Sequence, residues 1–404
     1  MIPSRGDSVP ALGSQVKGFE DARSRAWWLQ LDPLLFLATI CLIGFGSYVI
    51  GTATETDIPG QPDFYVSRQI AYGTAGLVFM LLIARFDYSR LREWKLGIYG
   101  GMIALIFFTL AMGTATRGSK RWIDLGFFQL QSSELGKVLL VVALSAFMVD
   151  RMRRISDRET TSRILLLAIL PAMLVVMQPD LGSGLVYMAI AASVLFVAGT
   201  KWTHFAALGG LTVAIVLAVL VAGPAIGVHV LKDYQVDRLT AFVNPTDDPS
   251  RQGYQLRQSQ VAIGSGQKTG RGPDDATQTK LDFLPEHHTD FVFSVVGEEF
   301  GFMGAALVLS LYALLIWRAL RILTMAKNLY GALIAGGIAA MLMFQTFVNV
   351  GMTIGIMPIT GVPLPLFSYG GSSVIVTFLA VGLLQSIHVQ GRMSTSAKHR
   401  ELVA

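Results

Sequence analysis

The chain has 404 residues, of which 52% are hydrophobic and 15% are charged, and its formal net charge is +5. A soluble chain of this length would carry about 25% charged residues, so the composition excludes an ordinary soluble protein and favours a polytopic membrane protein. The positive charge does not by itself indicate nucleic acid, because charges in a membrane protein must be assigned loop by loop. The single cysteine, Cys41, excludes an intramolecular disulfide.

Apolar residues gather in windows of about 18 to 25 residues, the length that a helix needs to cross about 30 Å of hydrocarbon. The tail before the first window has scattered charges and lacks an apolar run, so we expect a first helix that is not cleaved off. The windows predict an all-α polytopic membrane protein with ten spans at residues 33–52, 69–86, 96–113, 133–149, 163–177, 181–199, 204–223, within 290–317, 331–354 and 366–388.

These spans form one membrane domain, residues 33–388, between an N-terminal tail (1–32) and a C-terminal tail (389–404). The loops on the side of the two tails hold 20 of the 32 Lys and Arg residues. By the positive-inside rule this side is cytoplasmic, so both termini are expected in the cytosol.

Two loops on the other side are basic against this rule. Arg117, Lys120 and Arg121 lie together in TRGSKRWID, and seven more basic residues lie in the long loop of residues 224–289. A solvated loop is the simple interpretation. An anionic ligand at the outer leaflet is the alternative, because guanidinium and ammonium groups neutralise phosphate oxygens well.

The long loop between spans seven and eight is too long to lack structure in a compact protein unless it is functional or disordered. In GYQLRQSQVAIGSG, Tyr254 and Val261 are seven residues apart, as are Leu256 and Ile263. This spacing predicts a short helix that lies on the membrane surface.

Ionisable residues within spans are candidates for function, because they are costly to bury in lipid. Glu134 and Lys137 are three residues apart near the start of span four, so we expect them to pair, either to pin two helices or to line a polar cavity. Asp180 and Asp290 each precede a span and suit a helix N-cap. Glu298 and Glu299 either line a polar cavity or follow an interfacial segment, with the crossing helix starting at residue 300.

Two other patterns are weak indications of a metal site and a phosphate site. His287 and His288 are adjacent and lack the HExxH spacing that places two imidazoles on one helix face, which argues against a zinc site. The segment GSGQKTGRG resembles a phosphate loop, but Lys268 follows Gln267 where the Walker pattern requires Gly-Lys-Ser or Gly-Lys-Thr, so only a weak backbone cradle for some other phosphate is left.

The segment FVNPTDDPSRQGYQ contains Asp247 and Asp248 directly before a proline. This pattern is typical of a turn. Beside a basic surface that holds a sugar diphosphate, however, a carboxylate is also the group needed to accept a proton from an attacking hydroxyl. The residues alone leave both interpretations open.

Several motifs spread through most of the chain resemble the SEDS family (shape, elongation, division, sporulation). They are RGSKRWIDLG, QSSELGK, QPDLGS, NPTDDP with GYQLRQSQVAIGSG, ATQTKLDFLPEHHTDFVFSVVGEEFG and GVPLPLFSYGGSS. TQTKLDFLPE and GVPLPLFSYGG resemble the elongation branch more than the division branch. Two departures are visible: the usual QPSE reads Gln131-Ser132-Ser133-Glu134, which should change how span four begins, and Gln267 replaces a glycine, which should alter the loop's backbone.

The resemblance implies a bacterial inner-membrane glycosyltransferase that polymerises lipid II and releases undecaprenyl diphosphate during elongation and rod-shape maintenance. Asp248 falls on the family's essential loop aspartate. Other family motif positions fall on Arg117, Arg121, Trp122, Glu134, Lys137, Gln178, Asp180, Gln258, Ser259, His288, Thr289 and Asp290.

Combined with the reading of the residues, the resemblance predicts Asp248 as the general base, with Arg117, Lys120, Arg121 or a divalent cation (Mg or Mn) at the diphosphate. It implies lipid II, membrane lipids, a class B penicillin-binding protein and the elongation machinery as partners, and no nucleic acid. A lipid II flippase, a scaffold for the crosslinking partner and a division-type polymerase are the alternatives.

Overall fold

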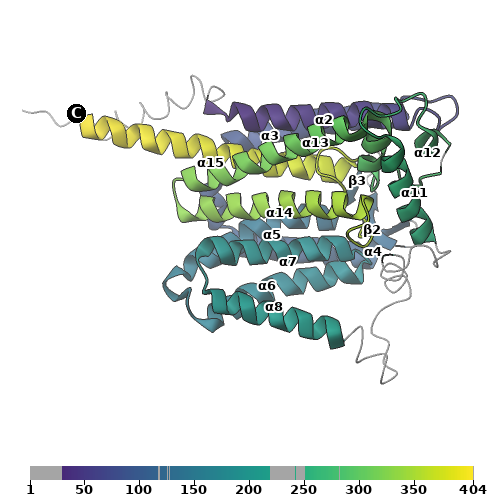
Figure 1. The fold of residues 1–404 in the computed structure, drawn as a ribbon. Coiled ribbons are helices and arrows are strands. Elements are labelled where there is room, and N and C mark those ends of the chain that lie inside the picture. The colour runs from purple at the N-terminus through teal and green to yellow at the C-terminus, as the bar shows by residue number, and fades with distance from the viewer. Residues whose placement is uncertain are drawn as a thin grey trace, which may run out of the picture.

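The computed structural model describes residues 30–116, 119–124, 126, 128–218, 242, 251–281 and 283–403. Asp247, Asp248 and Arg117 therefore lie outside the described residues. Within these ranges the chain is a bundle of long helices that lie side by side, with short helices and a small sheet gathered at one end (Figure 1). We call the end that carries the sheet the sheet end, and the other the far end.

The long helices are those expected from hydropathy, and the predicted helical membrane class is confirmed. Nine helices of the described part are long and apolar enough to cross a membrane. α8, a helix of 16 residues from Trp202 to Leu217, overlaps the predicted seventh span, residues 204–223. The ten are α2 (Pro33–Ala53), α3 (Phe64–Arg85), α4 (Lys95–Met112), α5 (Ser132–Asp150), α6 (Arg158–Met177), α7 (Leu181–Ala198), α8 (Trp202–Leu217), α13 (Val292–Met325), α14 (Leu329–Thr353) and α15 (Gly371–Val403).

The centre of the bundle is formed by α5, α14 and α15, which are mostly buried, whereas α3 and α4 are mostly exposed. Small residues let the central helices approach closely, as is common where helices pack in lipid. A Cβ on Gly337 of α14 would lie 2.8 Å from Val141 of α5. The exposed apolar side chains on α3 and α4, such as Leu82 and Phe107, face outward where lipid would surround them.

The far end has only short connections, including the 3₁₀ turns η2 (Tyr88–Arg92) and η3 (Met152–Arg154). At the sheet end, β1 (Thr114–Thr116), β2 (Ser119–Asp124) and β3 (Gln129–Gln131) form an antiparallel sheet in the order β1-β2-β3. Trp122 of β2 lies opposite Thr114 of β1 and Gln131 of β3. This small sheet is a local departure from the predicted all-α class.

The long loop contributes two helices, α11 (Arg251–Ser265) and α12 (Thr277–Lys280). α11 runs across the ends of the long helices at the sheet end (Figure 1) and contacts α13 and α14. Tyr254 and Val261 are exposed, whereas Leu256 is buried and Ile263 packs against the core. The predicted helix is thus confirmed, and the two seven-residue pairs lie on its opposite faces.

α13 is broken at Gly301, whose φ of 61° and ψ of −155° are not helical. The amides of Phe302 and Met303 donate to the carbonyls of Gln267 and Lys268, and the carbonyls of Glu298 and Glu299 accept from Arg271 and Gly272. The segment 267–272 therefore satisfies the backbone groups that the break leaves without helical partners.

This break resolves two expectations. Glu298 and Glu299 precede the long crossing segment of α13, in line with the alternative that placed them before the crossing helix. GSGQKTGRG docks against α13 through backbone hydrogen bonds rather than forming a phosphate cradle. Gln267, where the family pattern has glycine, keeps a left-handed φ of 47°, so the backbone has the conformation that glycine favours.

Candidate active site

The strongest concentration of buried charge at the sheet end is the pair Glu134–Lys137 in the first turns of α5. Lys137 Nζ lies 2.6 Å from Glu134 Oε1, and the two side chains are 1% and 3% exposed. The predicted pair is confirmed. Because both members belong to one helix, their attraction does not hold two helices together. Among the described residues, the hydrogen bond found for the Lys137 ammonium is the one to Glu134, so two of its three donors are free for a further acceptor.

Asp180 lies beside this pair and ties α7 to α5. Its Oδ1 accepts from the Ser183 amide (3.1 Å), as the predicted N-cap of α7, and its Oδ2 accepts from Ser133 Oγ (2.8 Å) and Gln131 Nε2 (3.2 Å). The altered QPSE motif contains Gln131 and Ser133, but nothing in their spacing points to a partner 49 and 47 residues away. Ser132 occupies the first helical position, where proline is also accepted, so the loss of that proline leaves the helix start in place.

Arg121 of β2 points to the turn between α6 and α7. Its Nε donates to the Gln178 carbonyl at 3.0 Å, and its guanidinium also donates to the Pro179 carbonyl. The side chain of Gln178 in turn donates to the Ile106 carbonyl of α4 at 2.8 Å. Both predicted ligand residues thus bind backbone, and Arg121 has fewer donors for a diphosphate than the sequence analysis assumed.

The remaining basic and loop residues are placed less completely. Lys120 belongs to β2, where it pairs with Ala115. Gln258 is half-buried on α11, and Ser259 is buried between helices, with its hydroxyl 2.6 Å from Ser294 Oγ of α13 and donating to the Thr353 carbonyl of α14 (2.7 Å). Ser259 therefore fastens α11 to the bundle and does not face a ligand space.

Three further predicted residues lie in the turn before α13. The His288 ring lies 4.7 Å from that of Tyr65, and its carbonyl accepts from the Tyr369 amide at 2.9 Å. Thr289 Oγ1 donates to Glu286. The N-cap of α13 is Phe291, without a side-chain bond, so the expectation that Asp290 caps this helix was wrong. The Asp290 carbonyl instead accepts from Asn349 Nδ2 at 2.9 Å.

Tyr369 links this turn to the loop before α15. Burial raises the pKa of its phenol to about 12, so the group stays protonated at neutral pH. Glu298 accepts from the amides of Gln278 and Thr279 at 2.8 and 3.1 Å, which caps α12. Glu299 accepts from Thr52 of α2 at 2.8 Å. These carboxylates have protein partners and stabilise the sheet end.

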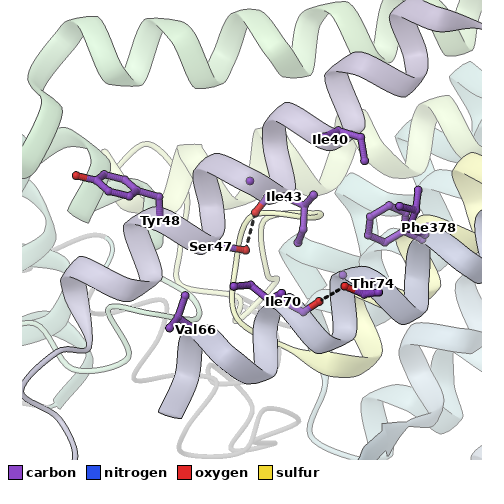
Figure 2. A pocket seen from close by; sticks show the side chains of 11 residues that line it. Ile40, Ile43, Ser47, Tyr48, Val66, Ile70, Thr74 and Phe378 are labelled. Atoms are coloured by element: carbon purple, nitrogen blue, oxygen red, sulfur yellow. Dashed lines mark hydrogen bonds between the residues drawn. The ribbon is translucent and has the colours of Figure 1, made fainter. Parts of the chain in front are cut away.

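An apolar pocket of about 410 Å³ opens between α2 and α3. Figure 2 shows Ile43, Tyr48 and Val66 around it, with Phe378 of α15 at one side. The hydroxyls of Ser47 and Thr74 are satisfied within their own helices, since Ser47 donates to the Ile43 carbonyl and Thr74 to the Ile70 carbonyl. The pocket therefore presents mainly hydrocarbon, the surface that suits a lipid chain.

The chain was compared with known proteins. A family model for FtsW, RodA and SpoVE, described as "Cell cycle protein", matches residues 30–393. The peptidoglycan glycosyltransferase MrdB of Escherichia coli K12 is 36% identical over 376 residues, which cover 93% of this chain and 98% of that protein. The fold is similar to a chain of a peptidoglycan synthase complex, solved to explain how polymerization and crosslinking are coordinated (TM-score 0.76, 31% identity, 90% and 99% coverage).

The fold is also similar to the rod shape determining protein RodA of Thermus thermophilus, with a TM-score of 0.65, 30% identity and 89% and 97% coverage. Each match covers nearly the whole of both chains. The polar cluster at Glu134, Lys137 and Asp180 and the pocket between α2 and α3 both lie within the matched family region.

Proposed function

Because the chain belongs to the FtsW/RodA/SpoVE family, the SEDS family that its motifs predict, it is a peptidoglycan glycosyltransferase, and we propose that it polymerises lipid II in the outer leaflet of the bacterial inner membrane. The observation that carries the proposal is the match to MrdB over nearly all of both chains. Elongation is the favoured process, because the solved relatives include RodA.

In the proposed reaction the 4-hydroxyl of one sugar attacks the anomeric carbon of a second, lipid-linked sugar. A new C–O bond forms, and the bond from that carbon to the diphosphate oxygen breaks with its electron pair, so undecaprenyl diphosphate leaves. Asp248 accepts the hydroxyl proton as general base. Arg117 and Lys120 neutralise the charge that develops on the diphosphate, with the help of a divalent cation such as Mg or Mn.

Lys137 has a different part in this proposal. Its ammonium is buried, its partner Glu134 lies on the same helix, and it keeps hydrogen-bond donors for an acceptor. We assign the pair to the binding of substrate, where Lys137 donates to an oxygen of the substrate and Glu134 balances the charge of the buried ammonium. Asp180, through Ser133, holds the start of α5 in place.

The pocket between α2 and α3 offers a place for the polyprenyl chain, since its lining is mainly apolar and α3 is mostly exposed. The sheet end is then extracytoplasmic and both termini are cytoplasmic, as the distribution of Lys and Arg residues favours. A class B penicillin-binding protein that crosslinks the strands is the proposed partner, in keeping with the synthase complex that the fold resembles.

The decisive experiment uses the purified chain and lipid II, with and without the crosslinking partner, and measures product length on gels. Wild type should form long glycan, and Asp248→Asn should form none while it keeps the wild-type melting temperature. Asp247→Asn is the matched control, because it removes the same charge one residue away and should retain polymerisation. Full activity of Asp248→Asn would refute the assignment of the base.

The same experiment separates the alternatives. A flippase that moves lipid II without reacting it would tolerate Asp248→Asn, and a scaffold would give no polymer under any condition. A division-type polymerase is the second candidate, because the matching family model covers FtsW as well as RodA. Depletion of the protein in cells decides between the two: loss of rod shape supports elongation, and filaments support division.

A further inference from the structure

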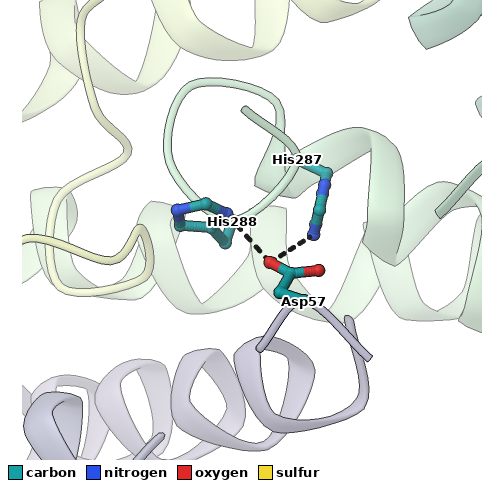
Figure 3. Close-up of side chains that lie close together, drawn as sticks. All are labelled: Asp57, His287 and His288. Atoms are coloured by element: carbon teal, nitrogen blue, oxygen red, sulfur yellow. Dashed lines mark ion pairs between the residues drawn. The ribbon is translucent and has the colours of Figure 1, made fainter. Parts of the chain in front are cut away.

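The sheet end contains a cluster of metal-binding side chains that the proposed reaction does not use. Asp57 lies in the loop after α2, and His287 and His288 lie in the turn before α13. Asp57 Oδ2 is 3.5 Å from His287 Nε2 and 3.9 Å from His288 Nδ1, and one ligand atom from each residue lies within 4.8 Å of the others. Figure 3 shows both imidazoles turned toward the same carboxylate oxygen.

His287 and His288 lack the spacing that joins two zinc ligands on one helix face, but they do not lie in a helix. They lie in a turn in which Glu286 has a left-handed φ of 59°. This backbone lets two adjacent side chains approach one point. The third ligand comes from a loop about 230 residues earlier in the chain, so no local spacing could have indicated it.

The two imidazoles are oriented in the way typical of metal ligands. His287 Nδ1 lies 3.1 Å from the Leu284 carbonyl, which can only accept, so Nδ1 carries a proton and Nε2 is the ring nitrogen that faces Asp57. Such a bond from the second ring nitrogen to a carbonyl is the usual outer support of a metal-bound histidine. The His288 ring is held between Tyr65 and Tyr369, at 4.7 and 5.8 Å between ring centres.

The separations are close to those of a tetrahedral site. Bonds of about 2.0–2.1 Å to a zinc ion place neighbouring ligand atoms about 3.3 Å apart. The observed distances from Asp57 Oδ2, 3.5 and 3.9 Å, require only small side-chain movements. The side chains of His287, His288 and Asp57 are 4%, 13% and 13% exposed, respectively. A bound ion would therefore be shielded from solvent but still reachable.

We propose that Asp57, His287 and His288 form a binding site for a divalent transition metal, with zinc as the best match. Two imidazoles and one carboxylate suit zinc and disfavour magnesium, which prefers oxygen ligands. Three protein ligands leave a fourth position for water or an anionic oxygen. The ion would fasten the α2–α3 loop to the turn before α13. The site is distinct from a magnesium or manganese ion at the diphosphate and does not depend on the proposed polymerase activity.

The test is a direct measurement of metal binding to the full-length protein in detergent, with any purification tag removed. The protein is stripped with a chelator, exchanged into chelator-free buffer and titrated with Zn²⁺ against a chromophoric competitor. Wild type should bind one equivalent, and Co²⁺ in its place should give the visible absorption of a tetrahedral site. Asp57→Asn and His287→Gln should each weaken binding by at least about 10-fold.

Matched controls remove the same kinds of group elsewhere. Asp63→Asn changes another acid of the same loop, and His204→Gln changes a histidine whose Nδ1 bonds to Thr161. Both should bind zinc like wild type. A zinc-dependent rise in melting temperature that is lost only in the site variants would support the site even where a variant folds poorly. Wild type that binds less than a fifth of an equivalent, or site variants that bind like wild type, would overturn the proposal. Loss of zinc binding leaves the polymerisation assay with Asp248→Asn as a separate question.

Discussion

The two ends of the bundle each bury an ion pair, and they do so in different ways. At the far end, Arg318 of α13 donates from Nε to both carboxylate oxygens of Asp32, at 3.1 and 2.9 Å. Asp32 also caps α2, and its backbone exchanges two hydrogen bonds with the Gln385 side chain of α15. This pair joins three helices, and the Asp32 carboxylate is fully buried.

At the sheet end, the Glu134 and Lys137 side chains are 3% and 1% exposed, against 0% for Asp32 and 14% for Arg318, and they lie within one turn of α5. Burying two charges costs several kcal/mol per ion before their attraction is counted. The far-end pair offsets that cost with bonds that connect α2, α13 and α15. Among the described residues, the ion pair of Glu134 and Lys137 connects no second helix, and the Lys137 ammonium has two hydrogen-bond donors left for another acceptor. We therefore propose that the far-end pair serves stability and that the sheet-end pair also serves the reaction.

The largest expected effect is on activity and comes from Lys137→Met, which keeps most of the side-chain volume. Loss of one preorganised charge that meets developing negative charge typically costs a factor of about 10²–10³ in rate. Polymerisation of lipid II should fall by that factor. The single variant should also be less stable by about 3–5 kcal/mol, because the buried Glu134 carboxylate would be left without its cation. The double variant with Glu134→Gln should recover most of that stability and remain inactive. A single variant with more than half of the wild-type rate would break the comparison.

At the far end, we expect Asp32→Asn to lower stability without lowering the polymerisation rate. Asparagine can still cap α2, so the change isolates the lost charge and leaves the Arg318 guanidinium buried without a counterion. Breaking such a pair costs about 3–5 kcal/mol. Thermal unfolding in detergent should show this loss, and the polymerisation rate per folded molecule should equal that of wild type. Addition of Arg318→Met should restore most of the stability. If Asp32→Asn instead lowered the rate without lowering stability, the far-end pair would have a catalytic part.

The helices could be predicted from sequence because each closes its backbone hydrogen bonds within its own segment, so hydropathy and length suffice to find it. α11 followed from the spacing of Leu256 and Ile263 in the same way. The start of α7 at Asp180 could also be predicted from sequence, since an N-cap is a local interaction. The same local rule failed at Asp290, because the turn before α13 is shaped by a bond from Asn349, which lies 59 residues further along the chain.

The parts of the candidate site that sequence did not reveal depend on pairings over long distances in the chain. Segment 267–272 resembles a phosphate loop, but two of its amides and two of its carbonyls bind the backbone at the break in α13. Arg121 looked available for phosphate, yet it binds the carbonyls of Gln178 and Pro179. The strands β1, β2 and β3 have three to six residues each and gain their order from one another. No periodicity in so short a segment carries that information.

A smaller effect is expected at the helix contact that positions the sheet-end pair. Gly136 lies between Glu134 and Lys137, and a Cβ there would overlap the Tyr187 hydroxyl, which donates to the Ser133 carbonyl at 3.0 Å. Overpacking of this kind costs about 1–3 kcal/mol. Gly136→Ala should therefore lower both stability and polymerisation, because α5 must move away from α7.

Addition of Tyr187→Phe to Gly136→Ala should recover most of the loss, since it removes the overlapping oxygen. Gly97→Ala on α4 is the matched control, because a Cβ at Gly97 meets no atom within 4 Å. Unfolding curves and rates of the three variants check the prediction. If Tyr187→Phe gave no rescue, the contact between α5 and α7 would not be what positions the pair.

The smallest effect concerns the partly exposed carboxylate of Asp87, which contrasts with Asp32 at the same end. Burial raises the pKa of Asp87, but hydrogen bonds from Ser89 and the charge of Lys327, 3.7 Å away, together lower it by more. The net pKa therefore lies below its ordinary value of 3.8. A lowered pKa contributes stability that is present above pH 3.8 and is lost as the pH falls through the folded-state pKa. Because the side chain is 30% exposed, solvent limits this contribution to about 1 kcal/mol or less. Asp87→Asn should be less stable than wild type at pH 6, and the difference in unfolding free energy should shrink as the pH falls below 3.8 through the folded-state pKa. A difference that does not change with pH would mean that Asp87 acts through its hydrogen bonds and not through its charge.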